Sequence, residues 1–196
     1  MNIFQKQIAA NIQKSNLWRP ASGMLILLLF FCGVPDIQAQ RLAVRTNVPE
    51  WFVSSPNVGL EFTLNSKLSL DMTGALCPIN FKKDLYYKHI RCQSEIKYWF
   101  DNILSRHYVG LMGYYSSFDI GIRRKGCFGD SYAFGITYGY NWVISRRWNF
   151  ELSAGLGAIR YRIDRYTPPA HHSSPNETGW MAAPIKLGAS FVYIIK

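Results

Sequence analysis

"SYAFGITYGYNWVI", residues 131–144, alternates large apolar side chains with small or polar ones. The large side chains fall at every second position: Tyr132, Phe134, Ile136, Tyr138, Tyr140, Trp142 and Ile144. This period of two predicts a β-strand with one apolar face. The other face contains Gly135 and Gly139, and glycine weakens a strand that only has to meet water. We therefore infer that the bulky face meets lipid and the glycine face encloses a crowded interior.

The same alternation recurs along the rest of the chain. Seven further segments predict strands: 41–47, 57–65, 68–77, 90–100, 107–118, 148–158 and 184–196. An even number of antiparallel strands allows the sheet to close on itself as an up-and-down barrel. The predicted fold class is all-β, an eight-stranded antiparallel up-and-down transmembrane β-barrel. A soluble, lipocalin-like barrel with the bulky face inward is the alternative.

The predicted connections alternate between long and short. Long connections are expected at 48–56, 78–89, 119–130 and 163–179, and short ones at 65–67, 101–106 and 145–147. Short periplasmic turns and long external loops are typical of outer-membrane barrels, so both termini should lie in the periplasm. Aromatic side chains near both ends of the strands predict two interfacial girdles. The short-turn girdle comprises Trp99, Phe100, Trp142, Trp148 and Tyr193, and the long-loop girdle comprises Tyr86, Tyr87, Tyr114, Tyr115, Tyr132 and Trp180.

The N-terminal segment has the features of a secretory signal peptide. Lys6, Lys14 and Arg19 precede the apolar run at 24–34, and Ala39 provides a small residue before a cleavage point. The run is shorter than the roughly 20 residues that a membrane-spanning helix needs. We predict a signal peptide over residues 1–39 and a barrel over 40–196, located in the bacterial outer membrane. The mature chain would then have a net charge of +8.

Alternation also predicts which charged side chains point into the barrel. An eight-stranded barrel is so narrow that side chains fill it, and glycines at 135, 139, 155 and 157 would make room for them. Buried charges are costly unless they are paired, so we expect a neutral network that plugs the lumen. A conducting pore is disfavoured, because open channels generally need about 16 strands or more. The predicted network contains four bases and four acids: Arg45, Arg91, Lys97, Lys186, Glu61, Asp71, Glu95 and Glu151.

Three cysteines remain after residue 39, at positions 77, 92 and 127. An exported protein can form disulfides, but an odd number leaves at least one thiol without an intramolecular partner. Strict alternation directs Cys77 and Cys92 to opposite faces, which is unfavourable for a disulfide. The sequence therefore leaves two alternatives, free thiols or a Cys77–Cys92 disulfide. No cysteine and histidine cluster indicates a metal site, and we expect no cofactor.

Several stretches together resemble a known family. They are "RTNVPEW" (45–51), "PNVGLEFTLNSKLSLD" (56–71), "IKYWF" (96–100), "YGYNWVISRRWNFELSAGLGAIRYRIDRY" (138–166) and "KLGASFVYIIK" (186–196). They are similar to a Bacteroidota family of small outer-membrane β-barrel proteins that is catalogued only as a domain of unknown function. The resemblance implies an exported barrel with no assigned catalytic residues. It also implies a possible partner, because surface fimbriae are often encoded near such proteins.

Basic residues outside the lumen gather in the predicted long loops. They are Lys82, Lys83, Lys88, Arg123, Arg124 and Lys125, and we name them the basic loop patch. Contact with lipopolysaccharide phosphates in the surrounding leaflet accounts for such a patch. Nucleic acid is not an expected partner, because no recognised binding module accompanies the charge. The favoured function is a non-enzymatic surface anchor or adhesion and assembly component, with outer-membrane lipid, lipopolysaccharide and a surface protein or fimbrial assembly as partners.

An enzymatic alternative rests on the last long loop. His171, His172 and Ser173 lie close together there, and histidine, serine and an acid are the groups that acyl transfer requires. A lipid A-modifying acyltransferase or deacylase is therefore the competing hypothesis. Adjacent polar residues are also common in ordinary solvated loops, and a triad depends on spatial geometry. The favoured function has no catalytic residues. Under the enzymatic alternative, the catalytic residues would be His171, His172 and Ser173.

Overall fold

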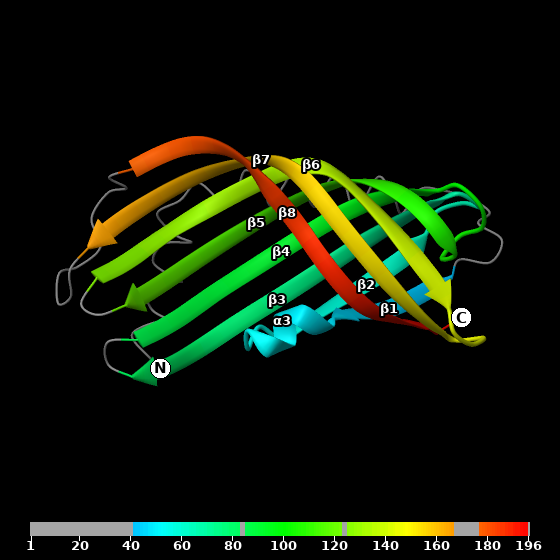
Figure 1. Cartoon of the computed structure of the whole chain (residues 1–196), viewed down its shortest axis with the longest axis horizontal. Helices are drawn as coiled ribbons and strands as arrows, with labels where there is room; N and C mark the ends of the chain where they lie inside the picture. Colours follow the sequence, from blue (N-terminus) through cyan, green and yellow to red (C-terminus); the bar gives the residue numbers. More distant parts are fainter. Residues whose placement is uncertain (1–40, 83–84, 123–124, 167–176, 196) are drawn as a thin grey trace, which may run out of the picture. The chain divides into compact units, whose positions relative to one another are not determined.

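A computed structural model describes residues 41–82, 85–122, 125–166 and 177–195, so the predicted signal peptide lies outside the described residues. Each strand pairs with its sequence neighbours in an antiparallel manner, and β1 also pairs with β8. The sheet therefore closes into a ring, as Figure 1 shows. The predicted all-β, eight-stranded up-and-down arrangement is confirmed. The strands are β1 (Leu42–Asn47), β2 (Asn57–Thr63), β3 (Leu68–Lys82), β4 (Leu85–Trp99), β5 (Arg106–Ile122), β6 (Lys125–Val143), β7 (Trp148–Tyr166) and β8 (Glu177–Ile194).

The two faces of the wall are as the alternation predicts. Phe134 and Ile136 on β6 are 65% and 64% exposed, whereas Thr137, the next residue of the same strand, is 1% exposed. The other strands alternate in the same way, so the apolar face of each strand covers the outside and the alternate residues face the lumen. The lipocalin-like alternative requires the bulky face of each strand to point inward, and this arrangement is not found in the described strands. Other exposed side chains of this outer wall are Leu60, Phe62, Met72, Leu76, Ile90, Ile96, Leu111, Leu152, Leu156, Leu187 and Phe191.

The prediction of two of the long loops is wrong, because the structure has strands there. Residues 78–89 and 119–130 continue the strands, because β3 runs to Lys82, β4 starts at Leu85, β5 runs to Ile122 and β6 starts at Lys125. The prediction ended each strand where the apolar alternation fades. Backbone hydrogen bonding does not need apolar side chains, so the hairpins extend beyond the apolar band.

The aromatic girdles are only partly as predicted. On the outside, Trp148 stacks on Tyr193 and Tyr115 on Tyr132, with ring centroids 4.9 and 5.0 Å apart. Three side chains instead point inward, which corrects their assignment: Trp99 is fully buried, and Tyr87 and Tyr114 line a cavity. Each of these side chains points inward because of its place in the alternation. The girdle prediction considered only the position of a residue along its strand. The Tyr86 side chain lies outside the described residues.

The first two strands are much shorter than the others. β1 and β2 contain 6 and 7 residues, whereas β3 to β8 contain 15 to 19. A short helix, α3 (Val48–Phe52), connects them, and its proline lies in the first turn, where the missing N–H needs no acceptor. β2 pairs with β3 only as far as Ala75, and β1 pairs with β8 only from Ser190 onward.

The short-turn end of the lumen is closed by apolar side chains. The connection between β4 and β5 folds inward, and Leu104 there packs with Trp99 and Tyr108 and is 2% exposed. Its φ of 59° lies in the left-handed region, which is uncommon for a leucine. Asn149 on β7 donates a 2.7 Å hydrogen bond to the Leu104 carbonyl and holds the turn in place.

Among the described residues, no helix has the length and apolar character that a membrane-crossing helix requires.

Candidate functional site

We call the half of the lumen next to the short turns the lower half, and the half toward the ends of the long strands the upper half. The lower half contains a network of buried ion pairs. Lys97 on β4 lies with its Nζ 2.9 Å from Glu61 Oε2 and 3.1 Å from Glu151 Oε2. Arg45 on β1 binds Asp71 at 2.5 Å and also contacts Glu151. All five side chains are at most 5% exposed. Ion pairs in the middle of the barrel therefore connect the side chains of five strands: β1, β2, β3, β4 and β7.

A second group of polar side chains extends the network toward β8. Lys186 Nζ lies 2.5 Å from Glu95 Oε2, and Thr137 donates a 2.5 Å hydrogen bond to Glu95 Oε1. Lys186 Nζ also lies 4.0 Å from Glu151 Oε1 and links the two groups, and Tyr108 donates a 2.6 Å hydrogen bond to the same Glu151 oxygen. The network as found joins three bases to four carboxylates. It differs from the predicted balance of four to four.

Arg91 accounts for that difference. Its side chain does not join the network but pairs with Glu50 of α3 at 2.5 Å. Glu50 is a partner that the sequence reasoning missed, because α3 lies in a connection that has no strand period. Asn47 also donates a 2.8 Å hydrogen bond to Glu50, so the end of β1 holds the carboxylate in place.

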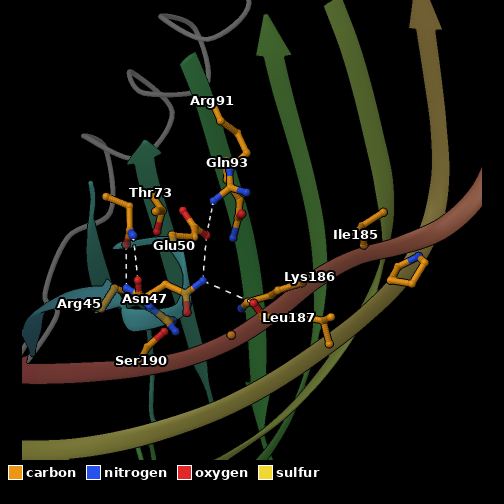
Figure 2. Close-up of a pocket in the computed structure, with 13 residues that line it drawn as sticks. Arg45, Asn47, Glu50, Thr73, Arg91, Gln93, Ile185, Lys186, Leu187 and Ser190 are labelled. Atoms are coloured by element: carbon orange, nitrogen blue, oxygen red, sulfur yellow. Dashed lines mark hydrogen bonds and ion pairs between the residues drawn. The ribbon is translucent and has the colours of Figure 1, made fainter. Parts of the chain in front are cut away.

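A cavity of about 160 Å³ lies directly above the network. Figure 2 shows the side chains of Arg91, Glu50 and Lys186 directed into this space from β4, α3 and β8. The prediction of a fully plugged lumen is therefore correct only for the lower half of the barrel. The cavity is lined by Arg45, Asn47, Glu50, Asn57, Thr73, Arg91, Gln93, Pro184, Ile185, Lys186, Leu187, Gly188 and Ser190.

A second cavity, of about 360 Å³, lies farther toward the long-strand end. It shares Arg91, Pro184 and Ile185 with the first, and we call the two together the upper chamber. Aromatic and aliphatic residues such as Tyr114 and Phe118 line this part of the chamber. Both parts of the upper chamber thus have polar and apolar side chains in their lining, and the part along β5 contains the larger share of aromatic rings.

Three buried polar atoms in this region have no hydrogen-bond partner among the described residues: Arg91 Nε, Glu50 Oε2 and His89 Nδ1. Buried polar groups are normally paired, and each one left unpaired costs free energy. The arginine atom is a donor and the carboxylate atom an acceptor. The chamber is therefore chemically able to bind a polar group that hydrogen-bonds to these atoms.

Ser55 and His89 form a pair at the edge of the chamber, with the serine Oγ 2.9 Å from the imidazole Nε2. This is the spacing of a nucleophile and its base. The serine is 1% exposed, however, and no carboxylate in the described part of the chain hydrogen-bonds to His89 Nδ1. The pair therefore lacks the orienting acid and the access that acyl transfer requires.

The remaining predicted residues lie at the long-strand end or outside the described part of the chain. His171, His172, Ser173, Lys83, Arg123 and Arg124 fall outside it. Lys82 ends β3, Lys88 lies in β4, and Lys125 begins β6 with an exposed side chain. The described residues contain no metal-binding cluster of three or more His, Cys, Asp or Glu.

The three described cysteines are free thiols. Cys77 is buried and Cys92 is exposed, so the two side chains lie on opposite faces of the wall, as alternation predicts. The Cys77–Cys92 bridge is therefore not formed. Cys127, near the start of β6, is partly buried.

Comparison with known proteins gives a family and no activity. No curated protein and no solved structure matches the chain. One family matches over residues 25–195, and it is described as a protein of unknown function, DUF3575. This match covers every described strand. The chain therefore belongs to the DUF3575 family of proteins of unknown function.

Proposed function

We propose that the protein is a non-conducting β-barrel of a bacterial outer membrane. It serves as a non-enzymatic anchor, and the ends of its long strands project at the cell surface. The outer wall supports this proposal. On β6 the outward side chains from Tyr132 to Trp142 are all apolar or aromatic, over a stretch of eleven residues. Membrane-spanning strands need roughly 9 to 11 residues, so the band matches the thickness of a bilayer.

Polar residues on the outside begin where the band ends. Beyond Tyr132 the outward Asp130 forms an ion pair with Arg162 of β7 at 2.8 Å. Arg160 and Arg162 lie over the rings of Trp180 and Tyr132, with 5.7 and 5.9 Å between the guanidinium carbon and the ring centre. Aromatic rings next to arginines are typical of the headgroup level. The strand ends beyond this level would stand in water.

The buried network supports the absence of conduction. Lys97, Glu61 and Glu151 occupy the centre of the barrel and are fully buried, and Leu104 closes the end below them. An ion would have to break this network to pass. The basic loop patch then serves to bind lipopolysaccharide phosphates or an acidic region of a surface partner such as a fimbrial assembly.

The proposal is tested by fractionation together with conductance. The protein should partition with outer membranes, require detergent for release and migrate faster on gels when unheated, as folded barrels do. In planar bilayers it should give no steady conductance. Recovery from the periplasm without detergent, or a stable open channel, would contradict the proposal.

The lipid A-modifying alternative stays a prediction, because its residues lie outside the described part of the chain. Deletion of the gene should leave the lipid A mass spectrum unchanged if the protein is an anchor. A mass shift on deletion that H171A and H172A reproduce would establish the enzyme instead. Replacement of Lys82, Lys83, Arg123 and Arg124 by Gln should weaken surface attachment most at low salt, where exposed charges act most strongly.

A further inference from the structure

Among the described residues, the wall of the barrel is not continuous beyond the ends of the short strands β1 and β2. The last contact of β2 with β3 is the hydrogen bond from the Leu76 N–H to the Pro56 carbonyl. Asn47 makes the last contacts with β8, at Leu187 and Ala189. Beyond these points no described strand pairs with β3 or β8 on the sides that face each other. Figure 1 shows this separation above α3, between the two long strands.

Prolines lie in both strands that border this separation. Pro78 in β3 and Pro184 in β8 are the only prolines in the described strands. Proline has no backbone N–H and occurs in sheets almost only at edges. Because the Leu76 N–H points to β2, the period of two directs the nitrogen of Pro78 to the same, open side. The two prolines therefore remove donors and disfavour the addition of another strand.

The separation leads directly into the upper chamber. Pro184, Lys186 and Leu187 belong to the free edge of β8 and also line the first cavity. Leu187 is 72% exposed on the outer wall, and Leu76 on the opposite edge is 57% exposed. Helix α3 borders the separation at the end of the short strands, and its Trp51 and Phe52 side chains are exposed. Apolar side chains thus border the separation on the outside, next to a polar space inside.

One of the basic side chains that line the first cavity has an unused hydrogen-bond donor. Arg45, Arg91 and Lys186 line it against the single carboxylate of Glu50. Arg45 and Lys186 are held by deeper carboxylates of the network, whereas Arg91 has only Glu50. Arg91 also keeps Nε without a partner among the described residues. A guanidinium with a free donor is well suited to a phosphate or carboxylate group.

We propose that the separation between β3 and β8 is a lateral opening through which a lipid-like molecule with an acidic head group enters the upper chamber from the membrane. Arg91 binds the head group, and the acyl chain lies between the free edges of β3 and β8. This inference rests on the proposed membrane location. It adds a binding site that an anchor alone does not require.

Isoleucine methyl NMR in lipid nanodiscs tests the opening. A phospholipid with a nitroxide on its acyl chain broadens the signals of methyl groups that it approaches. Ile136 on the outer wall should broaden in any membrane-embedded barrel, and Ile103, packed on the closed lower end, should not. The opening predicts that Ile185, which is 7% exposed inside the chamber, also broadens. A sharp Ile185 signal beside a broad Ile136 would overturn the opening alone, whereas a sharp Ile136 would overturn the membrane location.

Two charge-neutral double variants test the head-group site. E50Q/R91Q removes the inner ion pair, and D130N/R162Q removes a comparable pair on the outer surface. In the wild type, nitroxide-labelled phosphatidylglycerol should broaden Ile185 several-fold more than labelled phosphatidylcholine. The inner variant should lose this preference, and the outer variant should keep it. Equal broadening by both lipids in the wild type, or a preserved preference in the inner variant, would contradict the role of Arg91.

Discussion

Gly135 on β6 and Gly157 on β7 lie opposite each other so closely that a Cβ added to Gly135 would come within 2.5 Å of the Gly157 Cα. The same Cβ would meet Ile185 Cδ1 at 2.7 Å, because this side chain of β8 extends over the neighbouring strand β7. The two glycines therefore allow the backbones of β6 and β7 to approach closely and also leave room for Ile185. Gly139 likewise leaves room for the ring of Tyr108. This explains why one face of the 131–144 strand lacks bulk.

Gly157→Ala should destabilise the barrel. A Cβ at this position meets backbone atoms of β6 as well as Ile185, so the neighbours cannot simply rotate away. Overpacking of this kind costs about 1–3 kcal/mol. Urea unfolding from lipid vesicles measures the loss. Gly74→Ala is the matched control, because its Cβ meets nothing within 4 Å, and an equal loss in both variants would contradict the packing argument.

Lys97→Met should be strongly destabilising. Lys97 contacts Glu61, Glu151 and Asp71, and its removal leaves buried carboxylates with less compensation. Breaking a buried pair from one side costs about 3–5 kcal/mol. The double variant K97M/E61Q should regain part of this stability, because it removes one of the uncompensated charges.

The control for that prediction is Arg106→Gln. Arg106 is exposed and lies 3.9 Å from Asp101, so its loss should change the free energy of unfolding by less than about 1 kcal/mol. Equal stability of K97M and R106Q would mean that the lumen charges do not hold the barrel together.

Ile136→Arg should prevent membrane insertion. Ile136 is 64% exposed at the middle of the outer apolar band, and an arginine facing the bilayer midplane costs about 2–4 kcal/mol. Folding yield into vesicles, read from heat-dependent gel migration, should fall. Thr178→Arg adds the same side chain at an exposed position beyond the band and should fold normally. Normal folding of both variants would place the outer wall in water.

Cys127 should react slowly with a water-soluble maleimide. Burial raises the pKa of its thiol, and only the thiolate reacts. In the chain from residue 40 onward with Cys92 replaced by Ser, the labelling rate of Cys127 should keep rising with pH beyond the ordinary thiol range. Buried Cys77 should not react until the protein is unfolded in urea. Rapid labelling of two thiols in the folded protein would contradict these placements.

The strand faces could be predicted because alternation is a local property. Glu61 and Lys97 lie inward as the period of two requires, although they are 36 residues apart in the chain. The strand ends could not be predicted in the same way. The sequence "PINFKKDLYYKH" at 78–89 loses its apolar alternation, but β3 and β4 stay paired within it as far as Lys82 and Leu85.

The upper chamber depends on relationships that no local pattern contains. Glu50 meets Arg91 only because the β1–β2 pair stops early and α3 turns the chain at mid-height of the wall. One signal was nevertheless present in the sequence. Pro78 directly follows the predicted strand 68–77 and Pro184 begins the predicted strand 184–196, and proline in a sheet is typical of an edge or a strand end.

The unequal strand lengths also set the order in which the ring assembles. β1 and β8 meet over five residue pairs, from Ala43 with Ile194 to Asn47 with Ser190, whereas β6 and β7 share eighteen. The long hairpins can form from neighbouring segments at little loop-closure entropy, but the seam joins the first and last strands across the whole chain. β1 is thus the most weakly paired strand, with four residue pairs to β2 and five to β8, and closure through β1 is expected to be the final step. In hydrogen–deuterium exchange, the amides of β1 should be the first in the sheet to exchange and those at the centre of β6 among the last.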